Sequence, residues 1–237
     1  AMHLLYHIGG GRVPGRIVVD CTTEPREGFN IRGLLQGKEK PKEHVVILAH
    51  RDDGACPGAN DNGSGTSALL ELARLFGKLP RPKRRVEFLS TTSEEGITDG
   101  IFQYVANRRA KGELDNIVAA LDMDMIGVGG PARIIDGGKW PDEPSVPHNA
   151  KLNEYVAACG KEVGVMFGRL FASWGTPEEG CLNANGVPAT CIWKPDDPNY
   201  HSLNENVDNI DWNGVRAVAQ AVGLSAWRIA QSDVTFR

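Results

Sequence analysis

The chain has 237 residues, of which 41% are hydrophobic and 24% are charged, and its formal net charge is −4. This length and composition fit one globular α/β domain over residues 1–237, with room for a leader or an upstream domain before it. The mild negative charge gives no reason to expect a nucleic-acid partner, and no apolar run approaches the roughly 18 residues of a membrane span.

Apolar, β-rich runs alternate with stretches of helical periodicity. We expect strands at residues 15–21, 30–35, 45–49, 86–91, 117–123, 132–135 and 189–193. We expect helices at residues 64–79, 97–111, 149–163 and 212–231. The alternation predicts a parallel or mixed sheet with helices on both faces. The Pro/Gly/Asp-rich segment 137–147 is expected to be one long surface loop.

Histidines and acidic residues follow the ends of four expected strands. They are His50 and Asp52 after the third strand, Glu94 and Glu95 after the fourth, Asp122 and Asp124 at the fifth, and His201 after the last. The carboxyl ends of parallel strands gather at one edge of a sheet, so we expect these side chains to meet. A donor set of imidazoles and carboxylates without thiolate suits zinc and similar divalent ions.

Two of these pairs predict separate roles for their members. Asp52 lies two residues after His50, so on an extended chain it shares a face with the imidazole and could hold its second ring nitrogen. Glu94 and Glu95 diverge at a strand end. One carboxylate could then bind a metal while its neighbour acts as the general base toward the attacking water.

Five motifs carry a resemblance to a known family. They are His50-Arg-Asp52, Pro57-Gly-Ala-Asn-Asp61-Asn-Gly-Ser-Gly65, Ser93-Glu94-Glu95-Gly96, Asp124-Met-Ile-Gly127 and Tyr200-His201. In this order they resemble the co-catalytic zinc aminopeptidases, the leucyl aminopeptidase and glutamate carboxypeptidase family. The resemblance runs from about residue 30 to the final helix. It implies the zinc-exopeptidase (phosphorylase/hydrolase-like) fold, a three-layer α/β/α domain around a mixed, mostly parallel sheet.

The resemblance also implies a cofactor and a ligand set. The cofactor would be two divalent metal ions, with Zn²⁺ expected. Asp61 would bridge them, while His50 and Asp124 would complete one ion. Glu95 and His201 would complete the other.

The catalytic residues implied by the resemblance are Glu94, Asp52 and Tyr200. Glu94 would take a proton from the attacking water and return it to the leaving amine. Tyr200 would help to stabilise the tetrahedral intermediate. The peptide Asp61-Asn62 would be cis, as is usual in this family. Asp122 is expected to be polar packing or a partner of a ligand, and we favour packing.

The function implied is that of a metal-dependent exopeptidase, an aminopeptidase acting on peptides with a free N-terminus. One alternative is a glutaminyl cyclase-like transamidase with a single zinc, and another is a non-catalytic binding relative. The preference over a carboxypeptidase or dipeptidase rests on analogy. The compartment is expected to be extracellular or periplasmic, whereas the favoured N-terminal side chain, the native metal and the oligomeric state stay open.

Some polar residues have no place in this constellation. We expect four histidines to lie on the surface or in loops: His3, His7, His44 and His148. Cys56 is expected to be a packed neutral thiol, and pairing of Cys181 with Cys191 is left open. Glu178 and Leu182 stand where the family has aspartate and phenylalanine, a departure in the region that shapes the substrate pocket.

Overall fold

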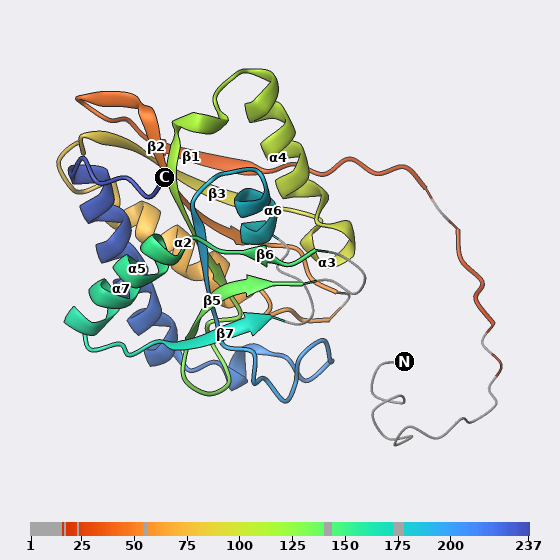
Figure 1. The fold of residues 1–237 in the computed structure, drawn as a ribbon. Helices are drawn as coiled ribbons and strands as arrows, with labels where there is room; N and C mark the ends of the chain where they lie inside the picture. The colour runs from red at the N-terminus through yellow and green to blue at the C-terminus, as the bar shows by residue number, and fades with distance from the viewer. Residues whose placement is uncertain (1–15, 17, 23, 55, 140–143, 173–177) are drawn as a thin grey trace.

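The computed structural model describes residues 16, 18–22, 24–54, 56–139, 144–172 and 178–237. A central sheet carries helices on both faces (Figure 1). The strands are β1 (Ile31–Leu35), β2 (Lys40–His50), β3 (Arg84–Thr91), β4 (Ile117–Asp124), β5 (Arg133–Gly138), β6 (Val146–Pro147), β7 (Gly168–Ala172) and β8 (Ala189–Trp193). The α-helices are α2 (Gly63–Phe76), α3 (Glu94–Ile97), α4 (Asp99–Ala110), α5 (Ala150–Glu162), α6 (Glu178–Ala184) and α7 (Trp212–Gln231), and short 3₁₀ turns lie at η1 (Leu114–Asn116) and η2 (Val207–Asn209).

The strand order places the expected functional strand ends side by side. The order is β1-β3-β2-β4-β8-β5-β6, with β7 paired to β5. The pairings β2–β3, β2–β4, β4–β8 and β5–β7 are parallel, and β1–β3, β5–β6 and β5–β8 are antiparallel. The mixed, mostly parallel sheet is therefore confirmed. Because β3, β2, β4 and β8 are contiguous and parallel, their carboxyl ends share one edge.

Alternate residues of the buried strand β2 supply two different cores. Ile47 packs with Leu72 of α2 and Val222 of α7, in the core cluster that also includes α5. Its neighbour Leu48 points to the opposite face and packs with Ile101 of α4, in the cluster that includes α6. The expected three-layer arrangement is confirmed (Figure 1). Among the described helices, none is long and apolar enough to cross a membrane.

Several expected elements differ from those observed. The strand expected at residues 15–21 is absent from its described residues, where Val18 and Val19 are 75% and 74% exposed. The expected loop 137–147 begins inside β5 and ends in β6, while residues 140–143 lie outside the described part. The strand β7 and the helices α3 and α6 were not predicted.

An ion-pair network is buried between β3 and α4. Glu87 of β3 is fully buried and accepts hydrogen bonds from Arg32 Nε at 2.6 Å, from Arg108 and, at 3.1 Å, from His44 Nδ1. Both guanidinium groups also lie over the Tyr104 ring. Burial alone would raise the pKa of Glu87, but these cationic and hydrogen-bonding partners outweigh it and lower the pKa to about 2. The surface position expected for His44 is wrong, since it is 2% exposed.

Candidate metal centre

The loop from β2 to α2 carries Asp61 to the edge of the sheet. Asn62 caps α2, since its Oδ1 accepts a hydrogen bond from Gly65 N at 2.9 Å, and its Nδ2 donates to the Met123 carbonyl at 2.8 Å. A Cβ on Gly65 would collide with that carbonyl, so this close approach of α2 to β4 requires glycine. The peptide Asp61-Asn62 is cis, as the family resemblance implied.

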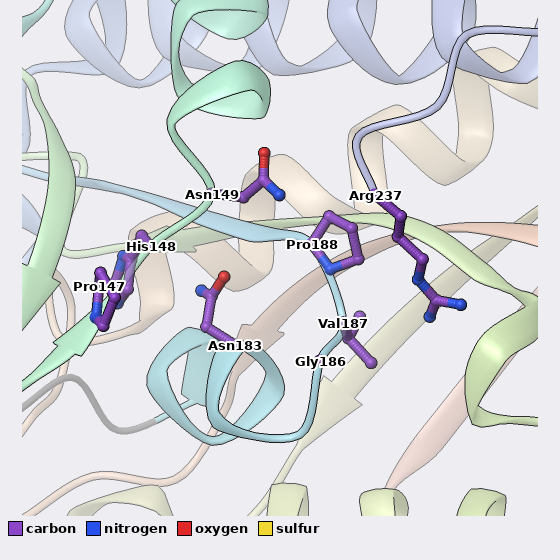
Figure 2. A pocket seen from close by; sticks show the side chains of 8 residues that line it. All are labelled: Pro147, His148, Asn149, Asn183, Gly186, Val187, Pro188 and Arg237. Carbon is purple, nitrogen blue, oxygen red and sulfur yellow. The ribbon is translucent and has the colours of Figure 1, made fainter.

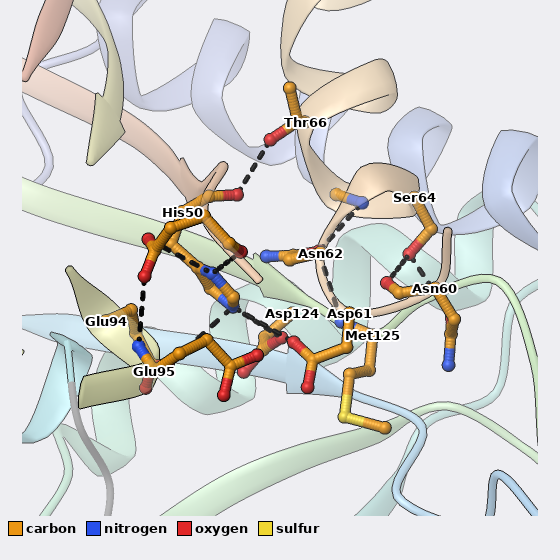
Figure 3. A network of polar contacts seen from close by, with 12 residues as sticks. His50, Asn60, Asp61, Asn62, Ser64, Thr66, Glu94, Glu95, Asp124 and Met125 are labelled. Carbon is orange, nitrogen blue, oxygen red and sulfur yellow. Dashed lines mark hydrogen bonds and ion pairs between the residues drawn. The ribbon is translucent and has the colours of Figure 1, made fainter. Parts of the chain in front are cut away.

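Five predicted ligands converge from separate elements, and Figure 3 shows four of them, His50, Asp61, Glu95 and Asp124. At one end of the cluster, His50 Nε2 lies 3.2 Å from Asp61 Oδ1 and 3.4 Å from Asp124 Oδ1. At the other end, His201 Nε2 lies 3.0 Å from Asp61 Oδ2 and 2.9 Å from Glu95 Oε2. The two oxygens of Asp61 therefore face two different histidines. The cluster divides into two groups of three donors that share one carboxylate.

The nitrogen and oxygen atoms around His50 are arranged as ligands of a cation rather than as hydrogen-bond partners of one another. His50 Nδ1 lies 3.2 Å from the Asp52 carbonyl oxygen and donates to it, so in the neutral imidazole the lone pair is on Nε2. That Nε2 and Asp124 Oδ1 are buried and form no hydrogen bond within the described residues. Ligand atoms on one zinc ion lie about 3.3 Å apart. The observed separations and the lone pairs match that arrangement.

The electrostatics of the cluster also favour a bound cation. Burial and the nearby Asp124 charge raise the pKa of Glu94 to about 9. Burial acts in the same direction on Asp61, but hydrogen bonds with His201 and His50 lower its pKa to about 2. Bonds to Asp61 and Glu95 raise the pKa of His201 to about 10. So many carboxylates around two imidazoles carry excess negative charge, which divalent ions would neutralise.

Two further predicted residues border the donors. Glu94 Oε2 lies 3.9 Å from His50 Nε2, and the side chain is 11% exposed. Tyr200 stacks on the His201 ring, with ring centroids 3.8 Å apart. Non-glycine residues with positive φ flank or form the site: Ser93 (57°), Met125 (48°) and His201 (55°). Such backbone conformations cluster where side chains must be aimed at a functional site.

Asp52 is arranged differently from the sequence-based expectation. Its carboxylate Oδ1 is 3.7 Å from His50 Nδ1, farther than its own carbonyl oxygen at 3.2 Å. Its Oδ2 instead accepts a hydrogen bond from Glu95 N at 3.2 Å. The backbone of Asp52 thus orients the imidazole, while its side chain fixes the start of α3, where Glu94 and Glu95 lie.

Sequence reasoning missed Glu205. This residue is 1% exposed, and its Oε1 accepts hydrogen bonds from Asp61 N at 2.6 Å and Asn60 N at 3.2 Å. Its Oε2 accepts from His201 N at 3.0 Å. Glu205 therefore ties the loop of the shared carboxylate to the loop of the second histidine. The only signal in the sequence was an acid four residues after His201.

These features define a three-layer α/β domain with a histidine- and carboxylate-lined metal centre at the carboxyl edge of its sheet. Residues 30–225 match the model of Peptidase family M28, and the chain belongs to that family.

The chain is similar to several larger proteins. It is 28% identical to a probable lipoprotein aminopeptidase, LpqL, of Mycobacterium tuberculosis, over 93% of this chain and 50% of the relative. It is 28% identical to a probable glutamate carboxypeptidase of Arthroderma benhamiae, over 87% of this chain and 31% of the relative. A zinc aminopeptidase from Bacillus subtilis has the same fold, with a TM-score of 0.71 at 21% identity, over 87% of this chain and 51% of that one. The chain thus spans about half, or less, of these proteins.

Proposed function

We propose that the chain is a metal-dependent aminopeptidase that hydrolyses the N-terminal bond of peptides with two zinc ions. The observation that carries this proposal is the division of the Asp61 carboxylate between two histidines. One ion would be held by His50, Asp61 and Asp124, and the other by His201, Asp61 and Glu95. When bound, such a pair polarises the scissile carbonyl and lowers the pKa of the attacking water.

Glu94 is the general base in this proposal. It belongs to neither donor group, yet it lies beside His50 and is mostly buried. From there its carboxylate can take a proton from the attacking water and pass it to the leaving amine. In this proposal Tyr200, which stacks on His201, donates a hydrogen bond to the developing oxyanion. Asp52 positions His50 and Glu95 without touching the reacting atoms.

Three observations support an aminopeptidase. The family match covers most of the chain, and a relative over 93% of the chain is named as an aminopeptidase. The carboxylate-rich site also favours a cationic group, such as the free α-amino terminus of a peptide. Another relative is named as a probable glutamate carboxypeptidase. The test must therefore also establish whether cleavage occurs at the N-terminus or at the C-terminus of a peptide.

The test compares the two adjacent acids, Glu94→Gln and Glu95→Gln. For each variant and for the wild type, metal content is measured together with hydrolysis of a panel of aminoacyl-p-nitroanilides. We expect the wild type to hold two zinc ions at this centre. Glu94→Gln should keep both ions and lose roughly 10²–10⁴-fold in kcat. Glu95→Gln should lose metal and turnover together.

The same assays define what would contradict the proposal. Undiminished turnover in Glu94→Gln would remove it as the base. One zinc per wild-type chain with no hydrolysis would contradict the two-metal peptidase. Peptides blocked at the N-terminus should resist cleavage, whereas peptides blocked at the C-terminus should be cleaved; the reverse result would identify a carboxypeptidase.

A further inference from the structure

A second group of metal-binding side chains lies beneath α6, apart from the donors around Asp61. It comprises Asp122 of β4, Cys191 of β8 and Glu179 of α6, each only 2% exposed. One donor atom from each lies within 4.8 Å of the other two. Asp122 and Cys191 are direct partners across the parallel pair β4–β8, so their side chains leave the sheet on one face. The helix α6 covers that face and adds Glu179.

The carboxylates of this group lack the partners that burial normally requires. Asp122 Oδ1 and Glu179 Oε1 form no hydrogen bond with any described residue, and neither oxygen of the neighbouring Glu178 does. Within the described part of the chain, no lysine or arginine lies within ion-pair distance of these three acids. An unpaired buried carboxylate costs several kcal/mol. The arrangement therefore requires that these acids be neutralised, either by shared protons or by a bound cation.

A buried histidine faces the same group. His148 Nε2 has no hydrogen-bond partner among the described residues and lies 3.9 Å from Glu179 Oε1. Its Nδ1 is 3.0 Å from the Ile135 carbonyl oxygen and donates to it, so the lone pair sits on Nε2. Donation of the other ring nitrogen to a backbone carbonyl is typical of metal-bound imidazoles. His148 lies in the loop between β6 and α5, as expected, but it is only 6% exposed.

We propose that Asp122, Glu179, Cys191 and His148 form a separate structural site for a zinc-like divalent cation. One thiolate, one imidazole and two carboxylates make a donor set that zinc accepts in tetrahedral geometry. Ligand atoms on one zinc lie about 3.3–3.8 Å apart, so small side-chain rotations would close the spacing among Asp122, Glu179 and Cys191. His148 lies beside Glu179, outside the group of three whose donors are all within 4.8 Å of one another, and would have to move toward the other two to complete the site. Binding deprotonates the Cys191 thiol and releases the proton to solvent.

A pocket borders one of the proposed ligands. A cavity of about 270 Å³ is lined by His148 and by Asn183, one turn after Glu179 in α6 (Figure 2). Once bound, the cation would fasten α6 to β4 and β8 directly behind Asp124. Asp122 is two residues before that ligand on the same strand, so the cation would hold the strand end that supports the catalytic centre.

The thiolate makes this site spectroscopically distinct. The donors proposed for the catalytic centre include no sulfur, so a sulfur–cobalt charge-transfer band reports only a thiolate site. We would exchange the metal of the full chain for Co²⁺, record the near-ultraviolet spectrum and count metal per chain. X-ray absorption of the zinc-loaded wild type should show a sulfur scatterer at about 2.3 Å. A wild type with neither signal overturns the proposal, and the paired acids then hold a shared proton.

Variants assign the signal to its residue. Cys191→Ala and Glu179→Gln should each lower metal content by one equivalent, and Cys191→Ala should abolish the sulfur–cobalt band. Cys159→Ala is the matched control, a buried cysteine in α5 outside the group, and should keep both the band and the metal count. Full metal content in Cys191→Ala, or a band lost instead in Cys56→Ala, overturns the proposal. These readouts do not depend on peptidase activity, so they stand even if the proposed function fails.

Discussion

Glu205 organises the centre through backbone amides, since it accepts hydrogen bonds from Asp61 N and His201 N. The Glu205→Gln substitution replaces one of the two accepting oxygens by an NH₂ group, which is a donor, and removes the negative charge. We expect zinc affinity to fall about 10–100-fold, as is usual when the partners of metal ligands are altered. Competition with a chromophoric chelator measures this affinity. Asp208→Asn, at an exposed site nearby in η2, serves as the control.

An unchanged affinity in Glu205→Gln would show that the amides of Asp61 and His201 hold their loops without this carboxylate. If affinity is kept while kcat falls, Glu205 instead influences the reaction through the position of His201.

The five donors could be predicted from sequence because each lies just beyond a strand end or within a recognisable motif. Glu205 could not be, because its role depends on a fold that brings its side chain to two backbone N–H groups far apart in sequence. The same reason applies to His148, whose burial depends on α6 and β5. A sequence pattern specifies residue types at strand ends, whereas backbone partners emerge only when distant segments meet.

At the scale of elements, the buried Glu87 network links β3 to β1, β2 and α4. The folded pKa of Glu87 is about 2, below its ordinary value of 4.5. Its ionised form therefore stabilises the fold above pH 4.5, and this stabilisation, about 3 kcal/mol, is lost as pH falls toward 2. Glu87→Gln should be less stable at pH 7 and should show a flatter fall in unfolding free energy between pH 4.5 and 2.

Urea unfolding of the chelated protein, run at several pH values, measures this effect without interference from metal loss. Glu113→Gln removes a more exposed partner of Arg108 and should keep the wild-type slope. If the unfolding free energies of wild type and Glu87→Gln fall in parallel as the pH is lowered, other carboxylates are responsible for the loss of stability in acid.

The elements that were predicted accurately have strong local signals. The bounds of α7 and β8 agree with the expectation, because α7 has a long amphipathic pattern after the cap Asp211 and β8 is a short apolar run. The helix α6 begins with the buried pair Glu178-Glu179, which reads as solvent-exposed in any local pattern. The apolar Val18 and Val19 predicted a strand, but among the described residues they form none and stay largely exposed. Local pattern does not reveal whether a strand finds a neighbour.

At the scale of the whole molecule, metal should contribute to stability. The donors come from four strand ends and loops, and any ligand that binds only the folded state raises its free energy of unfolding. Removing metal with a chelator should lower the Tm by roughly 5–10 °C, and adding zinc should restore it. Calorimetry with parallel metal analysis measures this. A Tm that stays constant while metal is lost would mean that the donors are held in place without it.

The hydrogen bonds of Glu205 also have a consequence for the order of events during synthesis. A chain leaving the ribosome presents His50, Asp61, Glu95 and Asp124 well before His201 and Glu205. Domains form as units, and contacts between distant segments form late. A nascent chain halted before residue 199 would hold only part of the donor set. The centre is therefore complete only once residues 201–205 have been synthesised, and the proposed peptidase activity cannot appear before then.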